Sequence, residues 1–244
     1  MHGCRARIGV LIPSGITIME SNLNSLLPEG VFCHYTRYNF TGGRTGDEKD
    51  VMERLARAEE FVEDATKLIV HARPSVVVFG GTGTSFIGGF GHDQKLIEIM
   101  QAASGGLPAT TTSTAVIKAL KALGISKISL AAPYVEAATQ AAVQFVEAHG
   151  IKVLEAKCLG KAGPDVPNTP PEDTYELIRS VDNPDSEAIF VSCTNFDVIN
   201  MIRYLETDLS KPVITSNQAT LWDMLRLAGI NDKINGYGKL LAEF

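Results

Sequence analysis

The stretches SVVVFGGTGTSF, residues 75–86, and EAIFVSCTNF, residues 187–196, decide the fold. Each is a short, β-branched apolar run that passes directly into small and hydroxyl-bearing residues. Runs that are apolar on both faces are typical of parallel strands covered by helices on two sides. We interpret the two stretches as equivalent points of an internal repeat, with chance similarity of two strand-to-helix turns as the alternative.

The repeat extends outward along the chain. The first half opens with RIGVLIP, residues 7–13, and the second with KISLAAP, residues 127–133, and both runs end in proline. Further strands are expected at 31–40, 151–158 and 212–216, and helices at 47–71, 93–103, 113–123, 134–149, 171–181, 196–206 and 217–228. This alternation predicts an α/β fold of two pseudo-symmetric, Rossmann-like lobes with parallel sheets. We expect residues 1–112 plus 217–244 in the first lobe and 113–216 in the second.

The position of a ligand site follows from this architecture. In open α/β sheets, ligands bind beyond the carboxyl ends of the strands. Both quoted stretches end there, so the active site is expected in a cleft between the lobes, with Gly81-Thr82 facing Cys193-Thr194.

Composition limits the classes of function. The chain has 244 residues, 45% of them hydrophobic and 20% charged, and a net charge of −6 without a Lys/Arg block. We therefore expect a globular protein with a small-molecule ligand and neither nucleic acid nor a membrane as partner. The N-terminus predicts a first strand rather than a signal peptide, and the protein is expected to be cytoplasmic. Four cysteines show no zinc spacing and no CxxC pair, so neither a metal site nor a disulfide framework is expected.

The glycine-rich stretch GGTGTSFIGGFGHD, residues 80–93, does not match a nucleotide-binding motif. Phe86 stands where GxGxxG needs its third glycine, and GxxxxGK[ST] is absent. What remains can offer backbone N–H groups and the hydroxyls of Thr82, Thr84 and Ser85 to an oxyanion. A tight turn without a chemical role is the alternative.

Cys193 is the candidate reactive group. It follows an apolar strand and precedes Thr194 and Asn195, residue types that cap helices, so we expect it at a helix N-terminus. The helix dipole would there lower the pKa of the thiol and make it reactive. Tyr134 ends the equivalent strand of the second half, where its hydroxyl could bind a carboxylate or be structural. For Cys4, Cys33 and Cys158 we expect packing roles.

Six stretches that together span nearly the whole chain carry a resemblance to a known family: IGVLIPSG, VVVFGGTGTSF, ATTTSTAVIKALKALGISKISLAAPY, IFVSCTNF, PVITSNQATLWDMLRLAG and GYGKLL. In these stretches the chain resembles the aspartate/glutamate racemase superfamily, specifically its arylmalonate decarboxylase and maleate cis-trans isomerase branch. It implies two pseudo-symmetric lobes, a site between them, and no cofactor or metal.

The resemblance also implies roles for single residues. Racemases and isomerases of the superfamily carry one cysteine on each lobe, and here Cys193 matches the second while Gly81 occupies the place of the first. One thiol is the pattern of the decarboxylase branch. Two asparagines expected of isomerases are replaced by Ile16 and by a residue near Pro164, and a tyrosine of the decarboxylases by Lys49.

The same resemblance assigns the substrate-binding groups. Pro13 ends the first strand and Ser14 follows it, and Thr82 and Gly83 match a threonine-serine pair that forms a dioxyanion hole. The hydroxyl missing at Gly83 is expected to be replaced by its own amide or by Thr84 or Ser85. Two more groups are implied, the carboxylate-binding hydroxyl of Tyr134 and the amide of Thr194.

These features predict a cofactor-independent decarboxylase of a small 2-substituted malonate. Its enediolate would lie in an oxyanion hole, and Cys193 would be the single proton donor. One alternative is a maleate-type cis-trans isomerase or racemase-like enzyme that uses Cys193. Another is a non-catalytic protein that binds a small dicarboxylate. The oligomeric state is left open.

Overall fold

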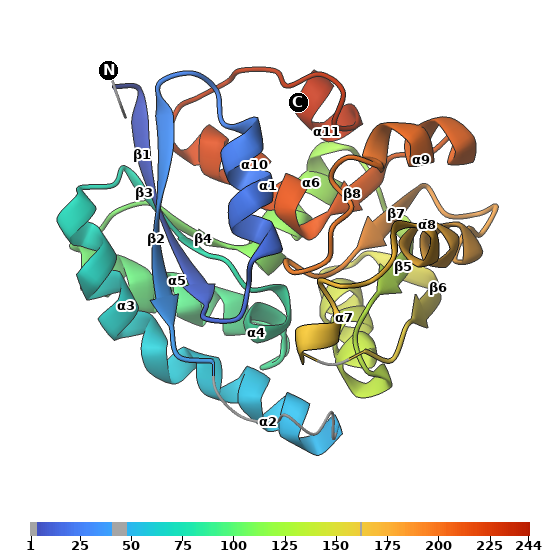
Figure 1. The fold of residues 1–244 in the computed structure, drawn as a ribbon, viewed down its shortest axis with the longest axis horizontal. Helices are drawn as coiled ribbons and strands as arrows, with labels where there is room; N and C mark the ends of the chain where they lie inside the picture. The colour runs from blue at the N-terminus through green and yellow to red at the C-terminus, as the bar shows by residue number, and fades with distance from the viewer. Residues whose placement is uncertain (1–3, 41–47, 162) are drawn as a thin grey trace.

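The computed structural model describes residues 4–40, 48–161 and 163–244. Two four-stranded parallel sheets lie side by side with helices packed around them (Figure 1). The first sheet has the order β2-β1-β3-β4 and consists of β1 (Ala6–Pro13), β2 (Val31–Tyr38), β3 (Val76–Phe79) and β4 (Ala109–Thr111). The second has the order β6-β5-β7-β8 and consists of β5 (Lys127–Ala132), β6 (Lys152–Cys158), β7 (Ala188–Val191) and β8 (Val213–Thr215).

The two sheets repeat the same arrangement, which confirms the predicted α/β fold of two pseudo-symmetric halves. In each half the first strand lies between the second and the third. Leu11 of β1 is paired with Phe79 of β3, and Ala131 of β5 is paired with Val191 of β7. The residues that follow β3 and β7 therefore leave equivalent edges of the two sheets, as the repeat predicts.

Helices cover both faces of both sheets. Those that begin before β5 are α1 (Ile18–Leu26), α2 (Glu48–Arg57), α3 (Val62–Ile69), α4 (Thr82–Phe86), α5 (His92–Ser104) and α6 (Thr112–Ala122). Those that follow are α7 (Glu136–Ala148), α8 (Pro171–Ser180), α9 (Ile202–Leu209), α10 (Ser216–Leu227) and α11 (Lys239–Glu243). The short 3-10 helices are η1 (Ala58–Phe61), η2 (Val70–Ala72) and η3 (Gly163–Asp165).

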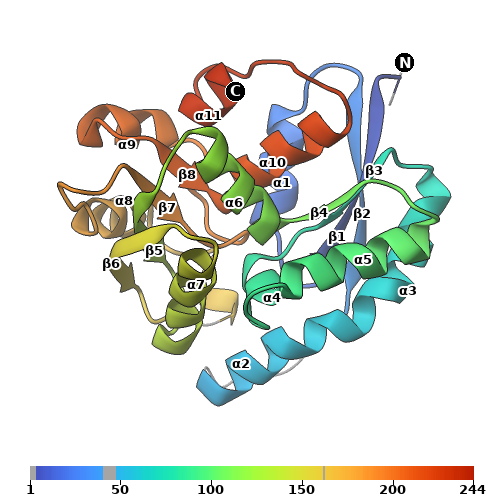
Figure 2. The same cartoon turned by 180° about the vertical axis from the view of Figure 1, so that it is seen from behind.

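Two helices cross between the halves. The helix α6 follows β4 of the first sheet in the chain. It nevertheless buries Val116 and Leu120 in a core with Ile128 of β5, in the second sheet. After β8, α10 buries Leu221 and Met224 in a core that includes residues of β1 and β3. The helices also contact each other between the sheets, where Figure 2 shows them side by side. We propose that the first lobe consists of residues 1–112 plus 217–244 and the second of residues 113–216, a division that follows this exchange of helices between the sheets.

Several features of local structure differ from the sequence predictions. The helix expected over 47–71 is divided into α2 and α3 by η1, and this 3-10 turn lets Val51 and Val62 join different cores. The strand β4 was not predicted, because three residues are too few for a periodic signal. The helix α1 was also not predicted, since polar Ser21, Asn22 and Asn24 interrupt its apolar pattern.

The helix expected over 196–206 begins later than predicted, at Ile202. In the described part of the chain, no helix is long and apolar enough to cross a membrane.

Candidate active site

A cavity of about 650 Å³ lies at the carboxyl ends of β1, β3, β5 and β7, between the two halves. Its wall comes from the turns after these strands, from α2 and from the segment after β6. The residues that line it are Pro13, Gly15, Ile16, Phe40, Val51, Arg54, Leu55, Gly81, Thr82, Gly83, Thr84, Tyr134, Val135, Ala138, Lys161, Gly163, Val166, Cys193, Thr194 and Asn195.

Most of the predicted site residues meet in this cavity. They are Pro13, Gly81, Thr82, Gly83, Thr84, Tyr134, Cys193 and Thr194. Ser14 and Ser85 do not line it. Ser14 Oγ accepts the Phe40 N–H (3.2 Å) on the outer side of the turn. Ser85 is fully buried, and its hydroxyl is 2.6 Å from Ser113 Oγ. Of the two residues, therefore, only Thr84 lines the cavity, and its role as a replacement for the hydroxyl missing at Gly83 stays a prediction.

Cys193 lies in the cavity wall, but its electrostatic setting differs from the prediction. The next helix in the chain begins only at Ile202, so the thiol does not lie at the N-terminus of that helix, where it was expected. Burial raises the pKa of the Cys193 thiol from 9.0 to about 11, against the lowering effect of the Asn195 N–H and the Tyr134 hydroxyl. The Asn195 N–H donates to Cys193 Sγ at 3.3 Å. The expected lowering of the pKa is wrong, and at neutral pH Cys193 is a protonated thiol.

The backbone of Cys193 is held in a strained conformation. Its φ of 133° lies in the left-handed region that favours glycine. The Cys193 N–H donates to Ser216 Oγ (3.0 Å), and the Thr82 hydroxyl donates to the same oxygen (2.9 Å). Ser216 is the first residue of α10 and is fully buried. One hydroxyl therefore fixes site residues from both sheets, and the sequence analysis did not find it.

Asn195 caps a helix, but not the one that follows it in the chain. Its side-chain Oδ1 accepts the N–H groups of Thr17 (3.0 Å) and Ile18 (3.2 Å) at the start of α1. Its amide donates to the Gly15 carbonyl at 3.4 Å. Asn195 thus ties the turn after β7 to the turn after β1 across the cavity. This explains why a capping residue here does not begin α9.

Tyr134 lies beside the thiol. Burial, together with the nearby Cys193 thiol, raises the pKa of Tyr134 well above its ordinary value. The Ser192 hydroxyl donates to the Tyr134 oxygen at 3.3 Å. Because the phenol stays protonated at neutral pH, it can donate to an anion in the cavity.

The turn after β3 is a short helix rather than the predicted loop. The amides of Thr82, Gly83 and Thr84 lie in the first turn of α4, so they have no acceptor within that helix. Thr84 Oγ1 donates to the Gly81 carbonyl (3.1 Å), and a Cβ added at Gly81 would overlap this hydroxyl. A Cβ at Gly83 would lie 3.0 Å from Leu55 Cδ2. Leu55 therefore occupies the space of a side chain at Gly83.

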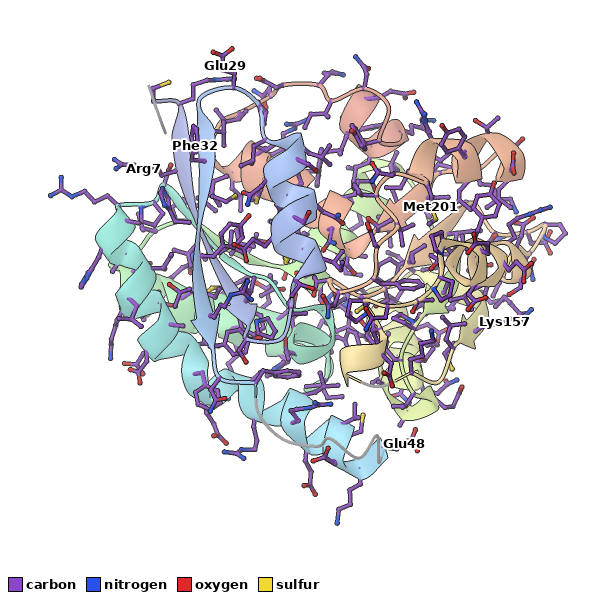
Figure 3. The ribbon with its side chains drawn as sticks, viewed as in Figure 1. Arg7, Glu29, Phe32, Glu48, Lys157 and Met201 are labelled. Atoms are coloured by element: carbon purple, nitrogen blue, oxygen red, sulfur yellow. The ribbon has the colours of Figure 1, made fainter. Side chains whose placement is uncertain are left out.

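The helix α2 covers the cavity and joins the two halves. Glu48, labelled in Figure 3 at the start of α2, accepts the Ala137 N–H at 2.6 Å in the first turn of α7. Val51 packs with Val135 and Ala138 in a small core. Lys49 is exposed and lies outside the cavity lining, so it does not replace a binding tyrosine.

Two cationic residues of the wall were not found by sequence analysis. Arg54 is on α2, one turn beyond Val51, and Lys161 follows β6. No motif marks either residue, and only the apolar face of the helix predicted over 47–71 could have indicated Arg54. No group of three or more His, Cys, Asp or Glu side chains that could hold a metal ion is found among residues 4–40, 48–161 and 163–244.

Comparison with known proteins identifies the family. A model of the arylmalonate decarboxylase family matches residues 37–241. The arylmalonate decarboxylase of Bordetella bronchiseptica is 33% identical to this chain over 242 residues, which cover 97% of this chain and 96% of that protein.

The chain belongs to the arylmalonate decarboxylase family.

The proteins similar to this chain also include a second kind of enzyme. A maleate isomerase from Geobacillus stearothermophilus is 23% identical over 249 residues, which cover 97% of each protein. The solved structure of the maleate isomerase Iso from Pseudomonas putida S16 has a TM-score of 0.90 at 24% identity and covers 98% of each chain. A double mutant of arylmalonate decarboxylase in its liganded form has a TM-score of 0.87 at 26% identity and covers 98% of this chain and 100% of the other. Both kinds of enzyme share this fold, so the fold does not separate the two activities.

Proposed function

We propose that the protein is a cofactor-independent decarboxylase of a small 2-substituted malonate. The observation that carries this proposal is the pair of positions that face the cavity at equivalent strand ends. One is Cys193, a thiol protonated at neutral pH, and the other is Gly81, which has no side chain. Such a site can deliver a proton to one face of a bound carbanion and has no thiol to serve the opposite face.

The reaction needs two events at the α-carbon of the substrate. The bond to one carboxylate breaks, CO₂ leaves, and the electron pair spreads onto the remaining carboxylate as an enediolate. The S–H proton of Cys193 then moves to the α-carbon, and the thiolate takes a proton from solvent. A pKa of about 11 suits this role because the thiol keeps its proton until a strongly basic carbanion forms beside it.

Donors in the wall can stabilise the enediolate. Tyr134 is held protonated by its raised pKa, and Gly83 and Thr194, whose amides can donate, line the cavity. The Thr82 hydroxyl donates to Ser216 in the free protein. A substrate anion is a stronger acceptor than a neutral hydroxyl oxygen, so Thr82 is expected to turn toward the bound substrate. Donors aimed at the developing charge are expected to contribute most of the rate acceleration.

The principal rival is maleate isomerisation, because maleate isomerases are among the relatives. A structure of one of them, from Nocardia farcinica, is described as holding a covalently bound succinylcysteine intermediate. In such chemistry the nucleophile is the thiolate. The raised pKa of Cys193 opposes this form at neutral pH, and Ile16 occupies the cavity wall where the resemblance implies an isomerase asparagine. Both observations favour the decarboxylase.

Proton NMR in heavy water separates the activities. The protein is incubated in separate samples with 2-phenylmalonate and with maleate, and Cys193→Ala serves as the control. We expect a monoacid with one deuterium introduced at the α-carbon, and no fumarate. Fumarate from maleate without turnover of the malonate would establish the isomerase. Binding of both diacids without turnover of either would point to a non-catalytic protein that binds carboxylates.

A further inference from the structure

The cavity wall carries two cationic side chains whose anionic partner in the substrate can be inferred. Arg54 and Lys161 both line the cavity, and none of the described lining residues is acidic. This contrasts with the chain as a whole, whose net charge is −6. The malonate carboxylate that leaves as CO₂ gains nothing from a cation, because a cation stabilises the charged ground state that must be lost. A cation therefore suits either the retained carboxylate or a further anion of the substrate.

Arg54 lies where the two halves meet above the cavity. Its guanidinium carbon is 5.0 Å from the centroid of the Phe40 ring, within the range of a cation–π contact. Its Nη1 atom lies 3.8 Å from the position that a Cβ at Gly163 would take. The side chain therefore extends from α2 in the first half to η3 in the second. Glu48 anchors the same helix to α7, so the backbone that carries Arg54 is fixed at both halves.

Lys161 is held in the wall by contacts with the second half. Its backbone N–H donates to the Pro133 carbonyl (2.8 Å), directly before Tyr134. Its ammonium group donates to Thr169 Oγ1 at 3.1 Å. An ammonium group has three N–H donors, so this contact leaves capacity for a ligand.

The wall also contains a continuous apolar part. Val51, Leu55, Val135 and Ala138 belong to one small core at its edge, and Val166 adds a further apolar side chain. A cavity of about 650 Å³ is far larger than a bare malonate needs and falls in the range of sites for sizeable ligands. A substituent on the malonate can therefore be accommodated.

We infer that the preferred substrate is a 2-substituted malonate whose substituent has an apolar stem and an anionic end. The malonate carboxylates lie against Cys193 and Tyr134, the stem contacts the apolar wall, and the terminal anion is bound by Arg54 and Lys161. A planar carboxylate suits the fork of N–H donors on an arginine. This inference rests on the proposed decarboxylase function.

Two substrates that differ only in one charge test it. They are 2-(3-carboxypropyl)malonate and its neutral isostere 2-(3-carbamoylpropyl)malonate. We expect kcat/KM for the carboxylate to exceed that for the amide by about tenfold or more, in keeping with a charge-assisted bidentate contact. Arg54→Gln and Lys161→Gln should each remove most of this preference, because they should lower kcat/KM for the carboxylate far more than for the amide.

Arg57→Gln is the matched control. Arg57 is on the same helix, is exposed and pairs with Glu60, and it does not line the cavity. This variant should keep the preference. Equal kcat/KM for the two substrates would overturn the inference, and so would an equal loss on both substrates in the Arg54 and Lys161 variants, because the cations would then serve the malonate core. Circular dichroism establishes that each variant is folded.

Calorimetric binding to Cys193→Ala separates this inference from the proposed function. If this variant binds the carboxylate at least about tenfold more tightly than the amide, the anion site stands even if the parent protein turns over neither substrate. Equal affinity for the two compounds would refute the anion site whatever the protein does to malonates.

Discussion

Alkylation of Cys193 should be slow at neutral pH and should become fast only under alkaline conditions. Iodoacetamide reacts with the thiolate, so the rate follows the ionised fraction of the thiol. Burial raises the pKa of Cys193 from 9.0 to about 11. Two pKa units reduce the thiolate fraction at pH 7.5 from about 3% to about 0.03%, roughly 100-fold. This slow reaction is the opposite of what a cysteine at a helix N-terminus would show.

The measurement needs a protein in which only Cys193 can react. Cys4 is exposed and the other two thiols are partly buried, so Cys4→Ser, Cys33→Ala and Cys158→Ser are combined. Intact-protein mass spectrometry gives the second-order rate constant between pH 7 and 11.5, with N-acetylcysteine as the free-thiol reference. We expect the logarithm of the rate constant to rise by about one per pH unit up to about pH 11.

A plateau in the rate near pH 7–8 would refute this reasoning. It would mean that Cys193 is a thiolate at neutral pH, which is the form required of a nucleophile. The assignment of Cys193 as a general acid would then have to be withdrawn. Protection by a bound malonate should slow the reaction further, because the ligand covers the thiol.

Four more predictions follow from the geometry. Cys193→Ala and Cys193→Gly should both abolish turnover. The free energy of unfolding in urea should be about 1–3 kcal/mol larger for the glycine variant than for the alanine variant, because glycine adopts the positive φ without strain. Equal stability of the two variants would show that the strain is absent. Gly81→Cys combined with Thr84→Ala, which makes room for the new Cβ, should exchange the α-proton of the chiral product in heavy water, whereas the parent should not; fast exchange by the parent would reveal a second acid. Ser216→Ala should lower kcat more than it raises KM and should lose about 1–3 kcal/mol of stability. Ser216→Thr should restore part of the kcat and part of the stability. An unchanged kcat in Ser216→Ala would show that Ser216 is not a positioning residue. The free energy of unfolding should fall above pH 9. The unfolded chain releases its thiol protons near pH 9, whereas in the folded protein the pKa values of Cys33 and Cys193 are raised to about 12 and about 11. A free energy of unfolding in urea that stays constant up to pH 10.5 would contradict both raised pKa values.

The architecture could be predicted from local patterns because parallel strands carry their own signal. β3 and β7 are apolar on both faces, and small residues follow each of them. The same signal placed Gly81 and Cys193 at equivalent strand ends, and the cavity brings them together. Residues at strand ends in a repeat are thus accessible to sequence reasoning.

Long-range contacts explain what could not be predicted. Asn195 has the sequence context of a local helix cap, yet it caps α1, which lies about 180 positions earlier in the chain. Without that contact in view, the pKa of Cys193 was expected to move in the wrong direction. Ser216 and Arg54 likewise reach the site from helices whose packing depends on the opposite half. No local pattern contains this information.

The exchange of α6 and α10 between the sheets bears on how the protein could be divided. A fragment that ends after α6 would lack α10, so the part of the apolar surface of β1 and β3 that α10 covers would be exposed to water. A fragment that begins at β5 would in turn lack α6, which buries Val116 and Leu120 against the second sheet. Each fragment therefore contains a helix that completes the hydrophobic core of the other fragment. The two pieces should therefore be insoluble or unfolded when expressed alone and regain structure only when co-expressed, as in fragment complementation.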